Sequence, residues 1–212
     1  SVKPEAEILS YPPKWVPDVF TWSNYTTVLA RYPYLDWAKN SIITAGLGTL
    51  LILLFSSLAA YALGRFEFRG KKLIYSVIVA MLLIPIQAYM IPLYLMCAKM
   101  GILNTYASII LPSVANVTSI FILTSFFKGL PKELEEAARI DGCGELRIFA
   151  QIMLPLSKPA LSTVTILTFI SNWNSFLWPM IAIREDTLKT LPVGIAQFMG
   201  SVNSNAQFQY GT

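Results

Sequence analysis

The most regular feature of the sequence is a series of long segments that contain no charged residue. They extend from Asn40 to Gly64, from Leu73 to Ala98, from Met100 to Phe127 and from Pro159 to Ile183. Each exceeds the roughly 20 residues that a helix needs to cross about 30 Å of hydrocarbon. The segments also lack the polar faces that helices of a soluble bundle would present to water. The pattern therefore predicts an all-α, polytopic transmembrane bundle with spans at about 41–63, 74–98, 105–127 and 160–183.

Composition supports a membrane protein. Hydrophobic residues make up 55% of the chain, charged residues make up 13%, and the mean hydropathy is +0.56. These values lie outside the usual range of soluble globular domains. The predicted topology separates the two cysteines, Cys97 and Cys143, by a membrane, so we expect no disulfide between them. Two separated thiols in a chain without histidine do not make a typical zinc site, so we also expect no metal site.

Lysine and arginine in the connecting loops predict the orientation, because cationic side chains near helix ends are retained on the cytoplasmic side. Four cations lie in the loop 65–72 and five in the segment 128–158, whereas the loop 99–104 contains one and the segment 184–212 contains two. The first two segments are therefore predicted to be cytoplasmic, and segments 1–39 and 184–212 to be extracytoplasmic. The start of the chain is Pro-rich and does not resemble a signal peptide, so we expect an earlier crossing ahead of it.

Prolines inside the predicted spans predict bends. Pro85 and Pro92 lie seven residues apart in the second span, so both fall on one face of that helix. Pro112 lies in the third span and Pro179 in the fourth. Proline removes a backbone donor and clashes with the preceding turn, so each should bend or loosen its helix. Bent helices can leave a polar cavity between them and can act as hinges.

Polar and aromatic side chains at membrane depth mark a candidate solute pathway. Amide side chains are costly in lipid, so we expect them to face the bundle interior or a water-filled path. Amides hydrogen-bond hydroxyl groups and indole rings stack on C–H surfaces, which suits a hydroxylated solute. Hydrogen bonding between helices, together with an interfacial belt of aromatic residues, is the alternative interpretation. The candidate pathway residues are Gln87, Asn116, Asn172, Trp173, Asn174 and Trp178.

The segment 128–158 is a polar insert between the third and fourth spans. Pro131 suits the first turn of a helix, acidic residues follow where the helix dipole favours negative charge, and Gly142 suits its end. We therefore expect a helix at about 131–141, and a second short helix after the glycine turn in the sequence ELRIFAQIM.

In the first helix of the insert, Leu134, Ala137 and Ala138 form a narrow small-residue stripe that the cleft of a partner could contact closely. In the second, the spacing of Leu146, Phe149 and Ala150 at i, i+3 and i+4 indicates a helix. The five cations and five acidic residues of the insert cancel, which argues against nucleic acid or anionic lipid as its partner. A shaped contact with another protein fits this balance better.

The insert resembles a known family motif. Glu136-Ala137-Ala138 is followed by three residues and Gly142, then by nine residues and the sequence from Ile152 to Pro155. This spacing is similar to the EAA loop of ABC importer permeases at all seven fixed positions. The sequence YPPKWVPDVFTWSNY near the start resembles the carbohydrate-uptake branch, in particular the smaller permease of maltose-type and glycerol-phosphate-type systems.

This resemblance implies a type I ABC importer permease in a bacterial inner membrane, surrounded by lipid, with alternating access as its mechanism. The chain would be a transport subunit and not an enzyme. Its implied partners are a second permease subunit, two ATPase subunits that bind ATP and Mg, and an extracytoplasmic solute-binding protein. Permeases of this branch usually have six spans, so the flanking spans would lie outside the sequence. The residues implied in coupling to the ATPase are Glu136, Ala137, Ala138, Arg139, Asp141, Gly142, Ile152, Leu154 and Pro155.

Other functions remain as alternatives. A permease for an amino acid or a polyamine would share the motif. An ion-coupled secondary transporter would usually carry a charged group at membrane depth, and the predicted spans contain none. A membrane-embedded enzyme would need a nucleophile and a base or a set of metal ligands. The segment GRFEFRGKK from Gly64 departs from a phosphate-binding P-loop in its glycine spacing and its last residue, so we expect no cofactor in this chain.

Overall fold

The computed structural model describes residues 20–22, 25–26, 29–30 and 32–210, the last ten as backbone only. All regular secondary structure in these residues is helical, which confirms the predicted all-α class. Most of the predicted extracytoplasmic segment 1–39 lies outside the described residues.

The structure begins its main bundle with one long helix and then alternates between helices and short turns. In chain order the elements are α3 (Tyr34–Arg65), α4 (Lys71–Ala80), the 3-10 turn η1 (Met81–Leu83), α5 (Ile86–Lys99), α6 (Tyr106–Val114), α7 (Val117–Gly129), α8 (Glu133–Ile140), α9 (Glu145–Ile148), the π-helical turn η2 (Phe149–Met153), α10 (Leu154–Leu156), α11 (Lys158–Trp173), α12 (Leu177–Ala182), the 3-10 turn η3 (Asp186–Leu188) and α13 (Leu191–Tyr210).

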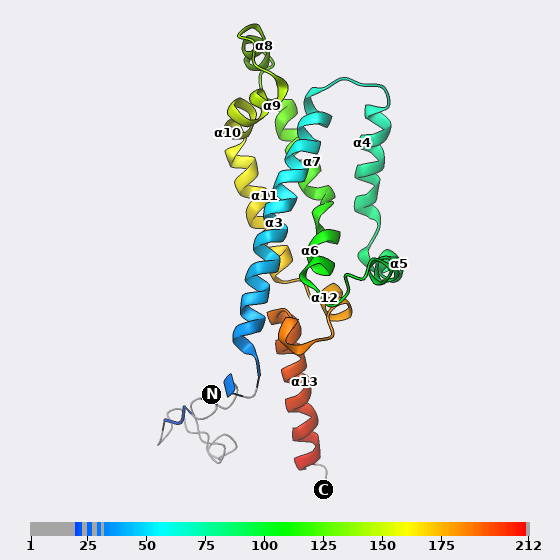
Figure 1. The fold of residues 1–212 in the computed structure, drawn as a ribbon, viewed down its shortest axis with the longest axis vertical. Helices are drawn as coiled ribbons and strands as arrows, with labels where there is room; N and C mark the ends of the chain where they lie inside the picture. The colour runs from blue at the N-terminus through cyan, green and yellow to red at the C-terminus, as the bar shows by residue number, and fades with distance from the viewer. Residues whose placement is uncertain (1–19, 23–24, 27–28, 31, 211–212) are drawn as a thin grey trace.

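Helix α3 is the central element of the bundle and packs against α6, α7, α11 and α13 (Figure 1). Its buried face is rich in small residues, including Ala45, Gly48, Ser56 and Ala60. Small side chains allow neighbouring helices to approach closely where lipid supplies no hydrophobic drive for association. The first helix of the bundle therefore serves as the surface on which the others assemble.

The second predicted span is divided at Pro85 into α4 with η1 and α5, which meet at an angle of 104°. Pro85 cannot continue the hydrogen bonding of the preceding helix, and Ile84 before it is extended, as a residue preceding proline prefers. Pro92 lies inside α5. Of the two predicted bends, the sharp one is therefore at Pro85.

The third predicted span contains a break that the sequence analysis placed elsewhere. Pro112 lies inside α6, and the chain leaves the helix at Ala115 and Asn116. The Asn116 side chain then begins α7, because its Oδ1 atom accepts hydrogen bonds from the backbone N–H of Ser119 at 2.9 Å and from the Ser119 hydroxyl at 2.7 Å. The side chain that restarts the helix thus decides where the break lies.

The fourth predicted span, about 160–183, is not one continuous helix. Helix α11 ends at Trp173, and α12 begins only at Leu177. Pro179 has no backbone N–H to donate to the preceding turn, which explains why α11 does not continue into α12. By length and apolarity, the described residues contain two helices able to cross a membrane, or up to four if each sharply bent pair counts as one span.

The end of the bundle that carries α12 and α13 is held to the start of α3. The Asn40 side-chain amide donates to the carbonyl oxygens of Thr187 and Lys189, and the Ser41 hydroxyl accepts from the backbone N–H of Leu191. The sequence analysis predicted no helix here, but α13 begins at Leu191. Segment 184–200 is therefore folded against the bundle.

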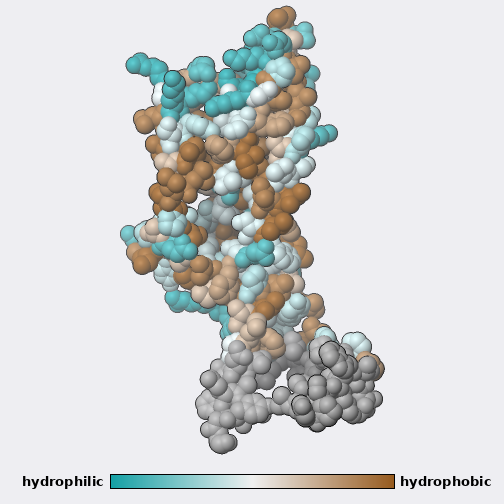
Figure 2. Space-filling model, turned by 180° about the vertical axis from the view of Figure 1, so that it is seen from behind, coloured by the Kyte–Doolittle hydropathy of each residue, from teal (hydrophilic) through white to brown (hydrophobic). Residues whose placement is uncertain are grey.

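The surface of the molecule divides into zones. Figure 2 shows hydrophobic residues over the middle of the described molecule and hydrophilic residues gathered at the end that carries α8. Many large apolar side chains on this surface are more than half exposed, among them Leu50, Phe55 and Ile91. Such extensive exposed apolar surface fits contact with lipid or with other membrane subunits.

Candidate functional site

Helix α8 and the turn after it form the first half of the insert. Three acidic residues occupy its first turn. Gly142 follows its C-cap in the left-handed conformation, with a φ of +79°. The N–H of Gly142 donates to the Arg139 carbonyl and the N–H of Cys143 donates to the Ala138 carbonyl, so the helix ends in a Schellman motif. The turn predicted at Gly142 is confirmed, and the helix is slightly shorter than the predicted 131–141.

The second half of the insert changes helix type along its length. Helix α9 passes into the π-helical turn η2 and then into α10. Ile148, Phe149 and Met153 point into a buried apolar cluster formed with α3, α7 and α11. Of Leu146, Phe149 and Ala150, whose spacing predicted this helix, only Phe149 is buried. A π turn adds a residue per turn and so shifts which side chains face the core.

The residues of the EAA-like motif lie on both sides of the insert. Glu136, Ala137 and Asp141 are exposed, whereas Ala138 packs into the apolar cluster. Ile152 and Leu154 are partly buried against the same cluster, and Pro155 is exposed in the first turn of α10. The predicted stripe on α8 is therefore divided, with Leu134 and Ala137 outside and Ala138 inside.

Large apolar side chains on the outside of the insert are left uncovered by the residues that the structure describes. Ile140 is 87% exposed and Leu146 is 77% exposed. Their positions explain this exposure, because Ile140 ends α8 beside the glycine turn and Leu146 lies in the first turn of α9. We call Leu134, Ala137, Ile140 and Leu146 the outer apolar residues of the insert. Their exposure makes this end of the molecule suited to contact with another protein.

Ion pairs hold the insert from the inside, and the sequence did not predict them, although Arg139 is among the residues implied in coupling. Glu135 pairs with Arg65 at the end of α3, with 2.8 Å between Oε1 and Nε. Glu145 accepts from Arg139 at 2.8 Å and from the Tyr61 hydroxyl at 3.0 Å. The hydrogen bond from Arg139 lowers the pKa of the Glu145 carboxyl, and the Tyr61 hydroxyl adds to this effect against an opposing contribution from burial. The sequence identifies Arg65 only as one of the four cations in the loop 65–72, because nothing in one sequence shows that its charge is buried.

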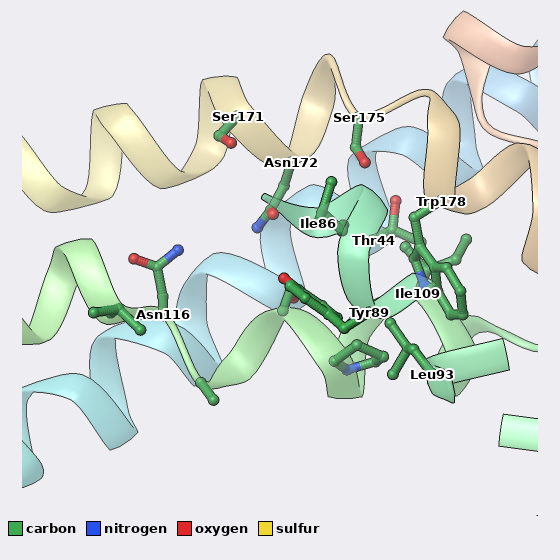
Figure 3. A pocket seen from close by; sticks show the side chains of 14 residues that line it. Thr44, Ile86, Tyr89, Leu93, Ile109, Asn116, Ser171, Asn172, Ser175 and Trp178 are labelled. Atoms are coloured by element: carbon green, nitrogen blue, oxygen red, sulfur yellow. The ribbon is translucent and has the colours of Figure 1, made fainter. Parts of the chain in front are cut away.

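A polar cavity of about 360 Å³ lies between the helices in the middle of the bundle (Figure 3). Residues from six helices line it or the breaks between them. They are Thr44 of α3, Ile86, Tyr89 and Leu93 of α5, Ile109, Pro112 and Ser113 of α6, Ala115, Asn116, Val117, Ser171 and Asn172 around α7 and α11, and Ser175 and Trp178 around α12. The helix breaks at Pro85, Asn116 and Asn174 therefore surround the cavity.

The structure brings three of the predicted pathway residues to this cavity. Asn116, Asn172 and Trp178 line it (Figure 3), and the indole N–H of Trp178 donates to the Ser108 carbonyl at 2.8 Å. The Nδ2 atom of Asn172 is buried and has no hydrogen-bond partner in the structure. An unpaired amide donor on a cavity wall is a ready partner for a polar solute or water.

The other three predicted pathway residues do not line the cavity. Gln87 is exposed on α5. Trp173 stacks on Phe169, with ring centroids 6.0 Å apart, and the Asn174 amide donates to the Ile170 carbonyl at 2.9 Å. The sequence did not mark the other polar lining residues, because hydroxyl-bearing side chains in apolar helices are commonly packing residues. These are Thr44, Tyr89, Ser113, Ser171 and Ser175.

The cavity wall can bind neutral polar groups. Its lining contains amides, hydroxyls and aromatic rings but no Asp, Glu, Lys or Arg. Within the part of the chain that the structure describes, no cluster of His, Cys, Asp or Glu could hold a metal ion. The arrangement fits a solute with hydroxyl groups and apolar faces better than an ion.

Comparisons with known proteins identify relatives along almost the whole chain. The family model described as "Binding-protein-dependent transport system inner membrane component" matches residues 52–201. The arabinooligosaccharide transport system permease protein AraQ of Halalkalibacterium halodurans is 37% identical over 190 residues, which cover 89% of this chain and 68% of the relative. The trehalose/maltose transport system permease protein MalG of Thermococcus litoralis is 40% identical over 184 residues, 85% of this chain and 66% of the relative. Among solved structures, a bacterial ABC transporter involved in the import of the acidic polysaccharide alginate matches with a TM-score of 0.81 and 26% identity, over 96% of this chain and 75% of that chain.

Proposed function

Because the chain belongs to the family of inner membrane components of binding-protein-dependent transport systems, we propose that it forms half of the path by which an ATP-driven importer moves a sugar or sugar-like solute across the membrane. The two relatives named above are permease proteins of transport systems for arabinooligosaccharides and for trehalose and maltose. The chain is accordingly a membrane permease, and in the proposed importer separate ATPase subunits hydrolyse ATP.

The chemistry of the cavity supports a sugar over the alternative solutes. Sugars present hydroxyl groups for amides such as those of Asn116 and Asn172, and apolar C–H faces for aromatic rings such as Tyr89 and Trp178. An amino acid or a polyamine would require partners for its charged groups, and the cavity lining contains no charged side chain. A gradient-driven transporter would need an ionisable group in the same place.

The observation that carries the proposal is the exposed insert. Its residues match the EAA loop, its outer apolar residues are uncovered, and its inner residues are fixed to the bundle. We propose that an ATPase subunit binds this outer surface. Ala137 allows a close approach of the partner, and the exposed carboxylate of Glu136 can accept hydrogen bonds from it.

The arrangement of the breaks around the cavity supports alternating access as the mechanism of this importer. When ATP closes the ATPase dimer, the insert moves with it, and the helices that meet the cavity at their breaks shift between two arrangements. ATP and the solute each favour the arrangement that they bind more tightly, so their binding shifts the population from one arrangement to the other. In this proposal a second permease subunit completes the path, and a solute-binding protein delivers the solute from outside.

The glycine turn of the insert provides the test. Gly142 has a φ of +79°, which proline cannot adopt, so Gly142→Pro should distort the turn between α8 and α9. In the importer reconstituted with its binding protein, this substitution should abolish solute-stimulated ATP hydrolysis while the chain still inserts into the membrane.

Gly144→Ala is the matched control. Gly144 has a φ of −74°, and a Cβ atom there meets no neighbour within 4 Å, so alanine should leave coupling intact. Normal stimulation of ATP hydrolysis in Gly142→Pro would contradict the docking role of the insert.

A further inference from the structure

A buried ion pair joins the insert to the end of α3. The Arg65 and Glu135 side chains are only 2% and 4% exposed, and 2.8 Å separates Nε from Oε1. The guanidinium Nη1 atom also donates to the carbonyl oxygens of Phe127 and Leu130, at 3.0 and 2.9 Å, where α7 ends. Arginine can serve all these acceptors because its donors are arranged in a rigid fork. The charge is therefore compensated and the geometry is fixed.

A second contact lies one turn earlier on the same face of α3. The Tyr61 hydroxyl donates to Oε2 of Glu145, the first residue of α9, at 3.0 Å. The Tyr61 ring lies 6.0 Å from the Phe127 ring and 5.2 Å from the Phe149 ring. Residues four apart share a helix face, so Tyr61 and Arg65 both point to the insert.

Arg139 connects the two contacts. Its Nε atom donates to Glu145 at 2.8 Å, and its Nη2 atom lies 3.6 Å from Oε2 of Glu135. We call the five connected side chains the α3 network. They are Tyr61, Arg65, Glu135, Arg139 and Glu145. The network attaches both helices of the insert to a single helix of the bundle.

Helix α3 reaches from this network to the cavity and beyond it. It has 32 residues, so it is roughly 48 Å long at the α-helical rise, and it contains no proline. Thr44 lines the cavity, and Gly48 lies so close to Asn172 that an added Cβ atom would be 3.0 Å from its Nδ2 atom. A movement applied at Arg65 thus reaches the cavity wall through one unbroken helix (Figure 1).

On its N-terminal side the insert is joined to the cavity by α7, whose end Arg65 also binds. The covalent route on its C-terminal side is less direct. It passes through the π-helical turn η2 and then bends by 78° before α11. Irregular turns and bends absorb displacement, whereas a straight hydrogen-bonded helix transmits it.

We propose that the α3 network transmits the movement of the insert to the cavity, which makes its side chains positioning residues for coupled transport. This inference rests on the proposed docking of the insert to an ATPase subunit. It adds that the buried contacts with α3 set how much solute each ATP moves. The network residues are distinct from the outer apolar residues that the partner would bind.

The test measures solute transported per ATP hydrolysed, in liposomes that contain the complete importer with its binding protein. Glu135→Gln removes the charge of the buried pair and keeps the shape of the side chain. Tyr61→Phe removes only the hydroxyl donor and keeps the ring packing. We expect the transported amount per ATP to fall on the order of fivefold in Glu135→Gln and about threefold in Tyr61→Phe, with the ATPase subunits still bound.

Glu67→Gln is the matched control, since Glu67 lies just after the end of α3, pairs with Lys71 instead of with a network residue, and is 87% exposed. The importer with Glu67→Gln should transport as much solute per ATP hydrolysed as the unaltered importer. A merely structural defect would reduce transport and ATP hydrolysis together and leave their ratio unchanged, and that result would overturn the inference. If the Glu135→Gln variant does not accumulate in the membrane, the solute transported per ATP by Tyr61→Phe tests the inference instead, because Tyr61→Phe keeps the apolar cluster intact. If the unaltered chain does not bind the ATPase subunits, the proposed function is wrong, and the inference falls with it.

Discussion

Gly194 shows how a single residue fixes the packing of the end of the bundle that carries α12 and α13. A Cβ atom added to it would lie 2.2 Å from two atoms of the Trp37 ring system. Trp37 is 3% exposed, and its indole N–H donates to the Asp186 carbonyl at 2.7 Å. The ring therefore cannot move aside without losing this hydrogen bond. Only a residue without a side chain allows the start of α13 to lie against α3.

Gly194→Ala should consequently destabilise the protein. Overpacking of a filled site typically costs about 1–3 kcal/mol, so we expect the thermal unfolding temperature in detergent to fall, with tryptophan fluorescence as the measurement. Gly46→Ala is the control, because Gly46 is helical and its added Cβ atom meets nothing within 4 Å. Alanine favours helix there, so this variant should be equally or more stable. Equal unfolding temperatures for Gly194→Ala and the unaltered chain would contradict the close approach.

At the residue scale, the sequence predicted which kinds of site the molecule contains better than it predicted which residues form each site. Amides in apolar segments correctly indicated a polar cavity, and Asn116 and Asn172 line it. Asn174 lies two residues from Asn172, but α11 ends between them, and the Asn174 amide turns back to its own helix. The Arg65–Glu135 pair had no signal at all, since seventy residues separate two charges that look like ordinary loop residues.

Among the elements, helix breaks depended on side-chain capping as much as on proline. Pro85 produced the predicted bend, but Pro112 lies within α6, and the break occurs at Asn116. Proline is tolerated where its missing donor and its ring are accommodated locally, whereas a capping side chain defines a new helix start. The π-helical turn η2 was likewise not predicted. The apolar pattern of the insert indicated a helix there, but it did not indicate the shift in the buried face of that helix.

The cap of α7 leads to a prediction for this element. Asn116→Ala removes the acceptor for both hydrogen bonds from Ser119, so it should lower the free energy of unfolding by about 1 kcal/mol. Asn116→Ser provides the comparison, because serine caps helices nearly as well while changing the cavity wall. Thermal unfolding in detergent measures both variants. Loss of stability in the serine variant equal to that in the alanine variant would show that the amide acts through something other than the cap.

For the whole molecule, the apolar pattern and the motif spacing predicted the all-α class and the family, because both depend on residue properties that one sequence displays. The depth and direction of each element in a membrane depend on lipid and partners as well. Lysine and arginine counts alone predict that the α8 end is cytoplasmic and the α12 end is extracytoplasmic. Helices α8 and α12 lie towards opposite ends of the bundle (Figure 1), so one labelling experiment can test the predicted side of the membrane for each.

Single cysteines at the two ends should respond differently to a membrane-impermeant maleimide. Cys143 is replaced by serine, and Cys97 stays because it is only 1% exposed. Asp186→Cys, at a side chain that is 66% exposed, should then be labelled on intact spheroplasts, since segment 184–212 is predicted to face outward. In the chain expressed without the ATPase subunits, which would otherwise cover this residue, Ile140→Cys, at a residue that is 87% exposed, should be labelled only after the membrane is permeabilised. The background chain without either new cysteine controls for reaction at Cys97. Labelling of Ile140→Cys on intact cells would place the insert outside, where no ATPase subunit could reach it, and would contradict both the orientation and the coupling proposal.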